Sequence, residues 1–176
     1  VTLNKDSTLP IDTFLSGYDA LLSHFGFEDW HHFASQDVAG PNWKIAYDGY
    51  MDLYHLPILH KDTFGPDYPN RANYYNWGPH QRVAGPDPRL AEFKDASPED
   101  WPEAPLLAGV WTRVPHISIA SFEGGGRAVM LSQLFPGDTP GTSVTTQHYL
   151  METAPDEAAA EAATEQFKFL KYVVQE

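Results

Sequence analysis

Apolar residues recur at helical spacing near both ends of the chain. Asp12 and Thr13 suit a helix start and Gly26 suits a stop, and the apolar face between them consists of Phe14, Leu15, Tyr18, Leu21, Leu22 and Phe25. A second stripe lies in a segment from about Pro155 to Val174 and consists of Ala163, Phe167, Leu170 and Val174. The spacing predicts one helix in each segment.

Strand-like patterns occupy much of the remaining chain. Trp30–Val38 mixes aromatic and polar residues, and Ala39-Gly40-Pro41 ends it. From Val110 onward, turn residues separate three further segments, which are Val114–Phe122, Ala128–Phe135 and Ser143–Met151. The pattern predicts an α+β fold with an antiparallel sheet and a long C-terminal helix. We expect one domain over residues 1–176.

The segment from Lys61 to Pro105 is rich in Pro, Asn, Asp and Gly and shows no clear period. Such a stretch is typical of a functional loop region or of partial disorder. Its aromatic residues indicate that much of it is ordered, and they are Phe64, Tyr68, Tyr74, Tyr75 and Trp77.

Composition narrows the possible functions. The net charge of −13 disfavours nucleic-acid binding. No apolar run reaches the roughly 18 residues that a membrane span needs, and Val1–Pro10 lacks the regions of a signal peptide. The chain contains no Cys, which excludes disulfides, thiol catalysis and iron–sulfur ligation by these residues. We expect a cytoplasmic protein in which any metal is held by imidazole and carboxylate.

The segment from Asp48 to His60 carries the main candidate chemistry. On one helix, Asp48, Met51, Asp52 and His55 would share a face. His60 would lie about 140° further round, so Pro57 is expected to bend the chain and let both imidazoles approach one ion. Asp52 is too close to His55 to be an easy third ligand, and it is better placed to accept a hydrogen bond from a ligand imidazole. Spacing alone leaves two unrelated His as an open alternative.

The segments Asn42-Trp43-Lys44 and Asp52-Leu53-Tyr54-His55-Leu56-Pro57-Ile58-Leu59-His60 together resemble a known signature. They are similar to the catalytic domain of Rieske-type non-haem iron ring-hydroxylating oxygenases, in the alpha (large) subunit. The resemblance continues through Phe25-Gly26-Phe27, Ala128–Thr146 and the final helix, and so covers most of the chain.

The resemblance implies a helix-grip (START/Bet v 1-like) domain in which His55 and His60 bind a mononuclear Fe(II). Asp52 would be the acid that connects the iron to a Rieske cluster in a neighbouring subunit. Asp48 and Met51 would line the substrate pocket. The implied partners are an aromatic or similar apolar ring compound, dioxygen and a reductase or ferredoxin. A homotrimer or an alpha–beta hetero-oligomer is expected for the full-length protein.

Two departures from the family pattern affect these expectations. The 2Fe-2S cluster needs Cys ligands, so it would lie in a domain that this chain lacks. The family's third iron ligand is an Asp that would fall beyond Glu176, and neither Glu165 nor Glu176 is expected to replace it. We therefore expect a catalytic-domain fragment, trimmed at both ends, that is inactive alone and binds iron poorly.

Other features suggest less. His31-His32 is expected at a partly solvated strand edge, and Gly124-Gly125-Gly126-Arg127 in a hairpin turn rather than an anion site. His116 and His148 could face the pocket, the core or the surface. Two rival functions remain, namely a helix-grip module that binds an apolar ligand without redox chemistry and a hydrolase with a His-His-carboxylate metal.

Overall fold

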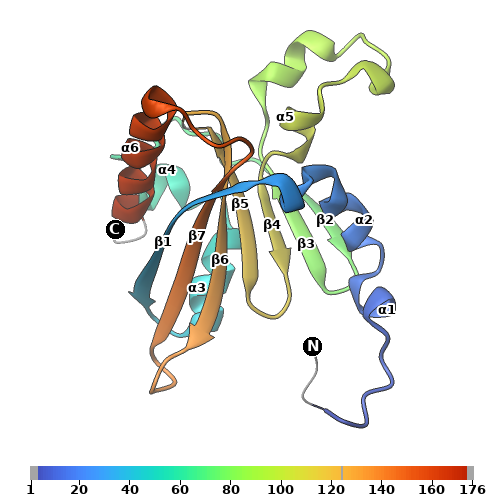
Figure 1. The fold of residues 1–176 in the computed structure, drawn as a ribbon, viewed down its shortest axis with the longest axis vertical. Helices are drawn as coiled ribbons and strands as arrows, with labels where there is room; N and C mark the ends of the chain where they lie inside the picture. The colour runs from blue at the N-terminus through green and yellow to red at the C-terminus, as the bar shows by residue number, and fades with distance from the viewer. Residues whose placement is uncertain (1–3, 124, 174–176) are drawn as a thin grey trace.

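The computed structural model describes residues 4–123 and 125–173. Its centre is a seven-stranded antiparallel sheet in the order β1-β7-β6-β5-β4-β3-β2 (Figure 1). The strands are β1 His31–Gly40, β2 Asn73–Trp77, β3 His80–Ala84, β4 Val110–Arg113, β5 Ile117–Glu123, β6 Arg127–Pro136 and β7 Ser143–Met151. This confirms the expected α+β class.

Helices cover both faces of the sheet. The helical segments are α1 Ile11–Leu15, α2 Tyr18–Leu22, η1 Ser23–Phe25, η2 Phe27–Asp29, α3 Trp43–Met51, α4 Leu56–Leu59, η3 Pro88–Phe93, η4 Pro98–Asp100, α5 Glu103–Leu107 and α6 Glu157–Val173. In Figure 1, α3 lies behind the strands and α6 lies beside the edge formed by β1 and β7. None of the described helices combines the length and apolar character needed to cross a membrane.

Alternation along the strands builds a separate core on each face. Val129 of β6 joins Trp111 and Ile119 in a core that Tyr18 and Phe25 complete. The neighbouring positions of β6 point the other way, into a core formed with α6 by Ala128, Met130, Tyr149, Met151, Ala163 and Leu170. The long C-terminal helix therefore packs on the face that also carries α3, as the helix-grip expectation requires.

The predicted N-terminal helix is broken, which corrects the prediction of a single element from residue 12 to 25. Ser16 and Gly17 both have left-handed backbone angles between α1 and α2. The serine side chain bonds back to the carbonyl of Thr13 at 3.0 Å, which competes with helical pairing. The break lets Tyr18 turn fully into the core, where its hydroxyl donates to the Gln81 carbonyl.

The segment from Lys61 to Pro105 contains more regular structure than predicted. β2 and β3 form a hairpin in which Asn73 pairs with Ala84 and Trp77 pairs with His80. The prediction failed because β2 shows no apolar–polar alternation, and most of its residues are exposed at the sheet edge. Short helices occupy the rest of the segment before β4.

His80 should make stability depend on pH. Its fully buried ring donates from Nε2 to the Phe14 carbonyl at 3.0 Å, and Nδ1 accepts from Val114 N–H at 3.3 Å. Burial lowers the pKa of His80, partly offset by the Phe14 carbonyl, so the unfolded chain binds the proton more readily. The contribution of His80 is therefore complete above about pH 6.5 and declines as the pH falls below that value.

We expect the midpoint of urea unfolding to fall between pH 7 and pH 5.5, and to fall less in a His80→Gln variant. Exposed His31→Gln provides the control and should retain the slope of the unaltered protein. Equal slopes in all three proteins would contradict the assignment to His80.

Candidate active site

The segment that carries the two candidate ligands consists of two short helices joined by a turn. Asn42 caps α3, because its side chain accepts the Lys44 N–H at 2.9 Å. The helix ends at Met51, and Asp52 has an extended backbone. Asp52 Oδ1 accepts the N–H of Tyr54 at 2.9 Å, a local bond that replaces helical pairing.

This geometry corrects two predictions about the segment. The predicted helix does not continue to His55, and the bend lies at Asp52 rather than at Pro57. Pro57 instead stands in the first turn of α4, and Leu56 is helical. A proline is favoured there because the first turn of a helix leaves its N–H groups without helical partners.

The turn nevertheless brings the two His rings together. The ring centroids of His55 and His60 are 5.2 Å apart with an interplanar angle of 68°. His60 is only 8% exposed, whereas His55 is half-buried. Burial lowers the pKa of His55; Asp52 acts in the opposite direction, and His60 adds to the lowering. A neutral imidazole is the form that binds a metal ion.

Asp52 lies between the His pair and the protein surface. Its Oδ2 is 3.9 Å from His55 Nδ1, too far for the hydrogen bond predicted from the sequence but close enough for electrostatic contact. Its side chain is 31% exposed, and nearby Tyr54 and Ile58 are well exposed. Asp52 could therefore connect the site to a partner outside the chain.

The residues described by the structure fit a metal site in part. Two neighbouring imidazoles suit a divalent transition metal. Within residues 4–123 and 125–173, no group of three or more His, Cys, Asp or Glu side chains gathers to hold an ion. Glu165 is exposed and paired with Lys168 at 2.7 Å, so it does not complete the set. Glu176 lies outside the described residues.

A cavity of about 1150 Å³ lies beside the His pair. Asp52, His55 and His60 line it together with parts of the sheet, of the segment before β4 and of α6. Asp48 and Met51, predicted to line the pocket, do not, because α3 turns a different face inward. The lining residues of α3 are Ala46, Gly49 and Tyr50.

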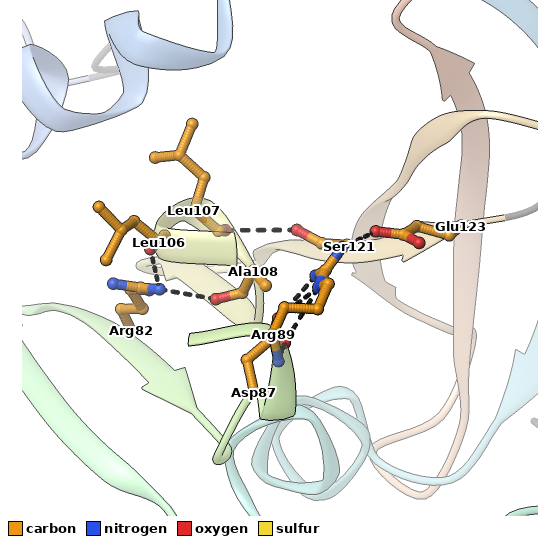
Figure 2. A network of polar contacts seen from close by, with 8 residues as sticks. All are labelled: Arg82, Asp87, Arg89, Leu106, Leu107, Ala108, Ser121 and Glu123. Carbon is orange, nitrogen blue, oxygen red and sulfur yellow. Dashed lines mark hydrogen bonds and ion pairs between the residues drawn. The ribbon is translucent and has the colours of Figure 1, made fainter. Parts of the chain in front are cut away.

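Figure 2 shows polar contacts at the rim of this cavity that the sequence did not reveal. Arg89 pairs with Asp87 at 2.6 Å and with Glu123 at the end of β5. The Arg89 hydrogen bonds lower the pKa of Asp87. Arg82 donates from Nη2 to the carbonyls of Leu106 and Ala108. These contacts tie the segment between β3 and β4 to the sheet.

The remaining candidate histidines lie away from the cavity. His31 and His32 are exposed at the sheet edge, as predicted. Ser35 Oγ lies 2.7 Å from His32 Nε2 and 2.8 Å from His148 Nδ1. His116 contacts the ring of Phe135. Neither His116 nor His148 lines the cavity.

Comparison with known families agrees with the fold and the His pair. Residues 27–176 match the family described as "Ring hydroxylating alpha subunit (catalytic domain)". The chain therefore belongs to the alpha-subunit catalytic domains of the Rieske-type ring-hydroxylating oxygenases. No curated protein matches the chain.

Solved structures of the quaternary ammonium Rieske monooxygenase CntA share this fold. The complex with inhibitor MMV12 gives a TM-score of 0.69 at 15% identity, covering 95% of this chain and 43% of CntA. The complex with L-carnitine gives 0.66 at 14% identity, covering 95% and 42%. The chain thus spans less than half the length of CntA, and at these identities the likeness shows the fold alone.

Proposed function

We propose that the chain is the catalytic domain of an oxygenase that inserts oxygen into an aromatic or similar apolar ring compound at a mononuclear Fe(II). His55 and His60 would hold the iron, with a third carboxylate from outside the described residues. The observation that carries the proposal is the pair of His rings 5.2 Å apart at the wall of a large cavity. When bound, the iron supplies dioxygen activation with two external electrons.

The chain's own residues would prepare the site for that chemistry. Lowering of the pKa keeps His55 neutral and ready to coordinate. The apolar side chains of Leu53, Leu56 and Phe64 line the cavity near the His pair and limit the access of water. The substrate would lie against these side chains, with the ring to be oxidised facing the two imidazoles.

An apolar ring substrate fits the charges of the cavity better than a cation. CntA has been solved with L-carnitine and gamma-butyrobetaine and is described as a quaternary ammonium monooxygenase. In this chain, two acidic residues are among the cavity-lining residues that the structure describes. Asp87 is paired with Arg89, and Asp52 lies beside His55. Neither carboxylate is left to pair with a bound cation.

Asp52 and its surroundings would receive the electrons. Tyr54, Ile58 and Leu59 are exposed around the turn, an apolar surface on which a partner could dock. One CntA structure is described as giving insight into inter-subunit electron transfer. We infer that a 2Fe-2S cluster of another domain, reduced by a reductase or ferredoxin, approaches here within a homotrimer or an alpha–beta oligomer.

Anaerobic titration with Fe(II) tests the iron site. We expect a His55→Ala/His60→Ala variant to lose affinity by at least about tenfold, because both nitrogen ligands are removed. The control is His32→Ala/His148→Ala, since these rings are 5.8 Å apart but lie outside the cavity. Calorimetry measures all three proteins. Equal binding by the His55/His60 variant and the unaltered chain would refute the proposal.

The alternative is a module that binds an apolar ligand without redox chemistry, which the size of the cavity alone would permit. It predicts that ligand affinity is indifferent to Fe(II), to chelation and to both His substitutions. A change in ligand affinity on addition of Fe(II) to the unaltered chain, absent from the His55→Ala/His60→Ala variant, would exclude it.

A further inference from the structure

A row of polar side chains crosses the whole sheet on the face beneath α3. Each member is the register partner of the next, and the row consists of Gln36, Gln147, Ser132, Ser118, Thr112, Gln81 and Asn76. Thr112, Ser118 and Ser132 are fully buried. Such a row is unusual beneath a helix because buried polar groups are costly unless they are hydrogen-bonded.

At its β7 end, the row is fixed by hydrogen bonds. Tyr50 donates from its hydroxyl to Ser132 Oγ at 3.1 Å and accepts from Gln147 Nε2 at 3.2 Å. Gln36 Nε2 donates to Gln147 Oε1 at 2.7 Å. Tyr50 and Gln147 both line the cavity. Their orientation is therefore set before any ligand binds.

Thr145 extends this polar wall into an apolar part of the cavity. It precedes Gln147 by two positions on β7, faces the same way and is 6% exposed. Its register partners are Val38 and Leu134, neither of which can bond its hydroxyl through a side chain. Within the part of the chain that the structure describes, that hydroxyl has no hydrogen-bond partner, although Thr145 lines the cavity. A buried hydroxyl of this kind is stabilised when a ligand supplies the missing partner.

We propose that Thr145, with Gln147 and Tyr50, forms a subsite that binds a neutral oxygen of the substrate, a hydroxyl or a carbonyl. This proposal rests on the proposed function in placing the substrate in this cavity. Each of the three side chains can both donate and accept hydrogen bonds, so the subsite serves either kind of oxygen. The substrate is then an apolar ring compound with one oxygen substituent away from the position to be oxidised.

The charge of the wall excludes an ionic substituent at this position. β1 and β7 contribute Val38, Ala39, Gly40, Thr145 and Gln147 to the lining, and none of these is charged. A carboxylate or an ammonium group buried here would lack a counter-charge, which costs far more than burial of a hydroxyl. The subsite therefore selects neutral compounds over acids of the same shape.

Paired probes that differ by one oxygen test the subsite. The dissociation constants of 2-naphthol and 2-methylnaphthalene are measured with metal-free protein by quenching of tryptophan fluorescence. We expect Thr145→Val to weaken 2-naphthol by about fivefold and to leave 2-methylnaphthalene unchanged, because one neutral hydrogen bond is lost. Thr145→Ser should retain the affinity for 2-naphthol.

The next residue on β7 gives a matched control. Thr146 points to the other face and donates to Asp37 Oδ1 at 2.8 Å, so Thr146→Val should leave both constants unchanged. The unfolding midpoint separates binding from a structural role, because Thr145→Val removes an unpaired hydroxyl and should be at least as stable as the unaltered chain.

Three results would overturn the proposal. These are an unchanged 2-naphthol constant in Thr145→Val, an equal loss for both probes, or no binding of either probe by the unaltered chain. The proposed function fails independently of this test, since Fe(II) titration of the His55/His60 variant requires no probe. Selective loss of 2-naphthol affinity together with absent iron binding would support the subsite and refute the iron site.

Discussion

Replacement of Trp111 by alanine is expected to lower the free energy of unfolding by about 3–5 kcal/mol. The indole is 2% exposed and contacts the rings of Tyr18 and Phe25 at centroid distances of 5.8 and 5.7 Å. Its Nε1 donates to the Leu107 carbonyl at 2.9 Å, and the Arg82 guanidinium lies 4.7 Å from its ring. The substitution would therefore leave a cavity, lose a buried hydrogen bond and loosen the segment before β4.

Urea unfolding followed by circular dichroism measures this loss. Trp101 provides the control because it is also a tryptophan with one local hydrogen bond, from Nε1 to the Ala96 carbonyl, but is only half-buried. Trp101→Ala should cost less than half as much as Trp111→Ala. Equal losses would show that the Trp111 cluster is not the centre of this core.

Substitution of Gly125 by alanine is expected to destabilise the protein by about 2–4 kcal/mol and to displace α6. Gly125 has φ of +73°, and an added Cβ would collide with the backbone carbonyl of Ala159 in α6. Because backbone forms the obstacle, no side-chain rotation relieves the clash. Leu170 and Val173 of α6 line the cavity, so displacement of the helix would also open the ligand site.

The neighbouring glycine separates the clash from backbone strain. Gly126 has φ of +133°, but an added Cβ would meet no atom within 4 Å. Gly126→Ala should therefore show the strain alone and keep α6 in place. Hydrogen exchange of the α6 amides follows the displacement. The same protection in both variants would rule out the proposed contact between the hairpin and the helix.

The elements with a regular pattern could be predicted from the sequence. β7 has the predicted bounds, Ser143–Met151, because its alternation is bordered by turn residues. α6 begins within two residues of the predicted start, and Ala163 and Leu170 are buried as expected. Val174 of the predicted stripe lies outside the described residues. These features depend on local spacing, which periodicity detects.

Features that depend on tertiary contacts or side-chain bonds could not be predicted. The break at Ser16 and the turn at Asp52 each arise from one side chain bonding to nearby backbone, a choice that helical spacing does not reveal. The pairing of Arg89 with Glu123 joins positions far apart in the sequence. The His pair was found through a signature resemblance, whereas the role of Thr145 depends on which face of β7 meets the cavity.

The strand order has a consequence for how the chain folds. β2 to β7 pair with their neighbours in sequence, whereas β1 pairs with β7, which joins His31 to Met151 and Gly40 to Ser143. The successive hairpins have low contact order and can form early, while closure of β1 onto β7 pays the entropy of a loop that contains every other strand. His55 and His60 lie inside that loop. The cavity and its candidate ligands are therefore assembled late, when the last strand reaches the first.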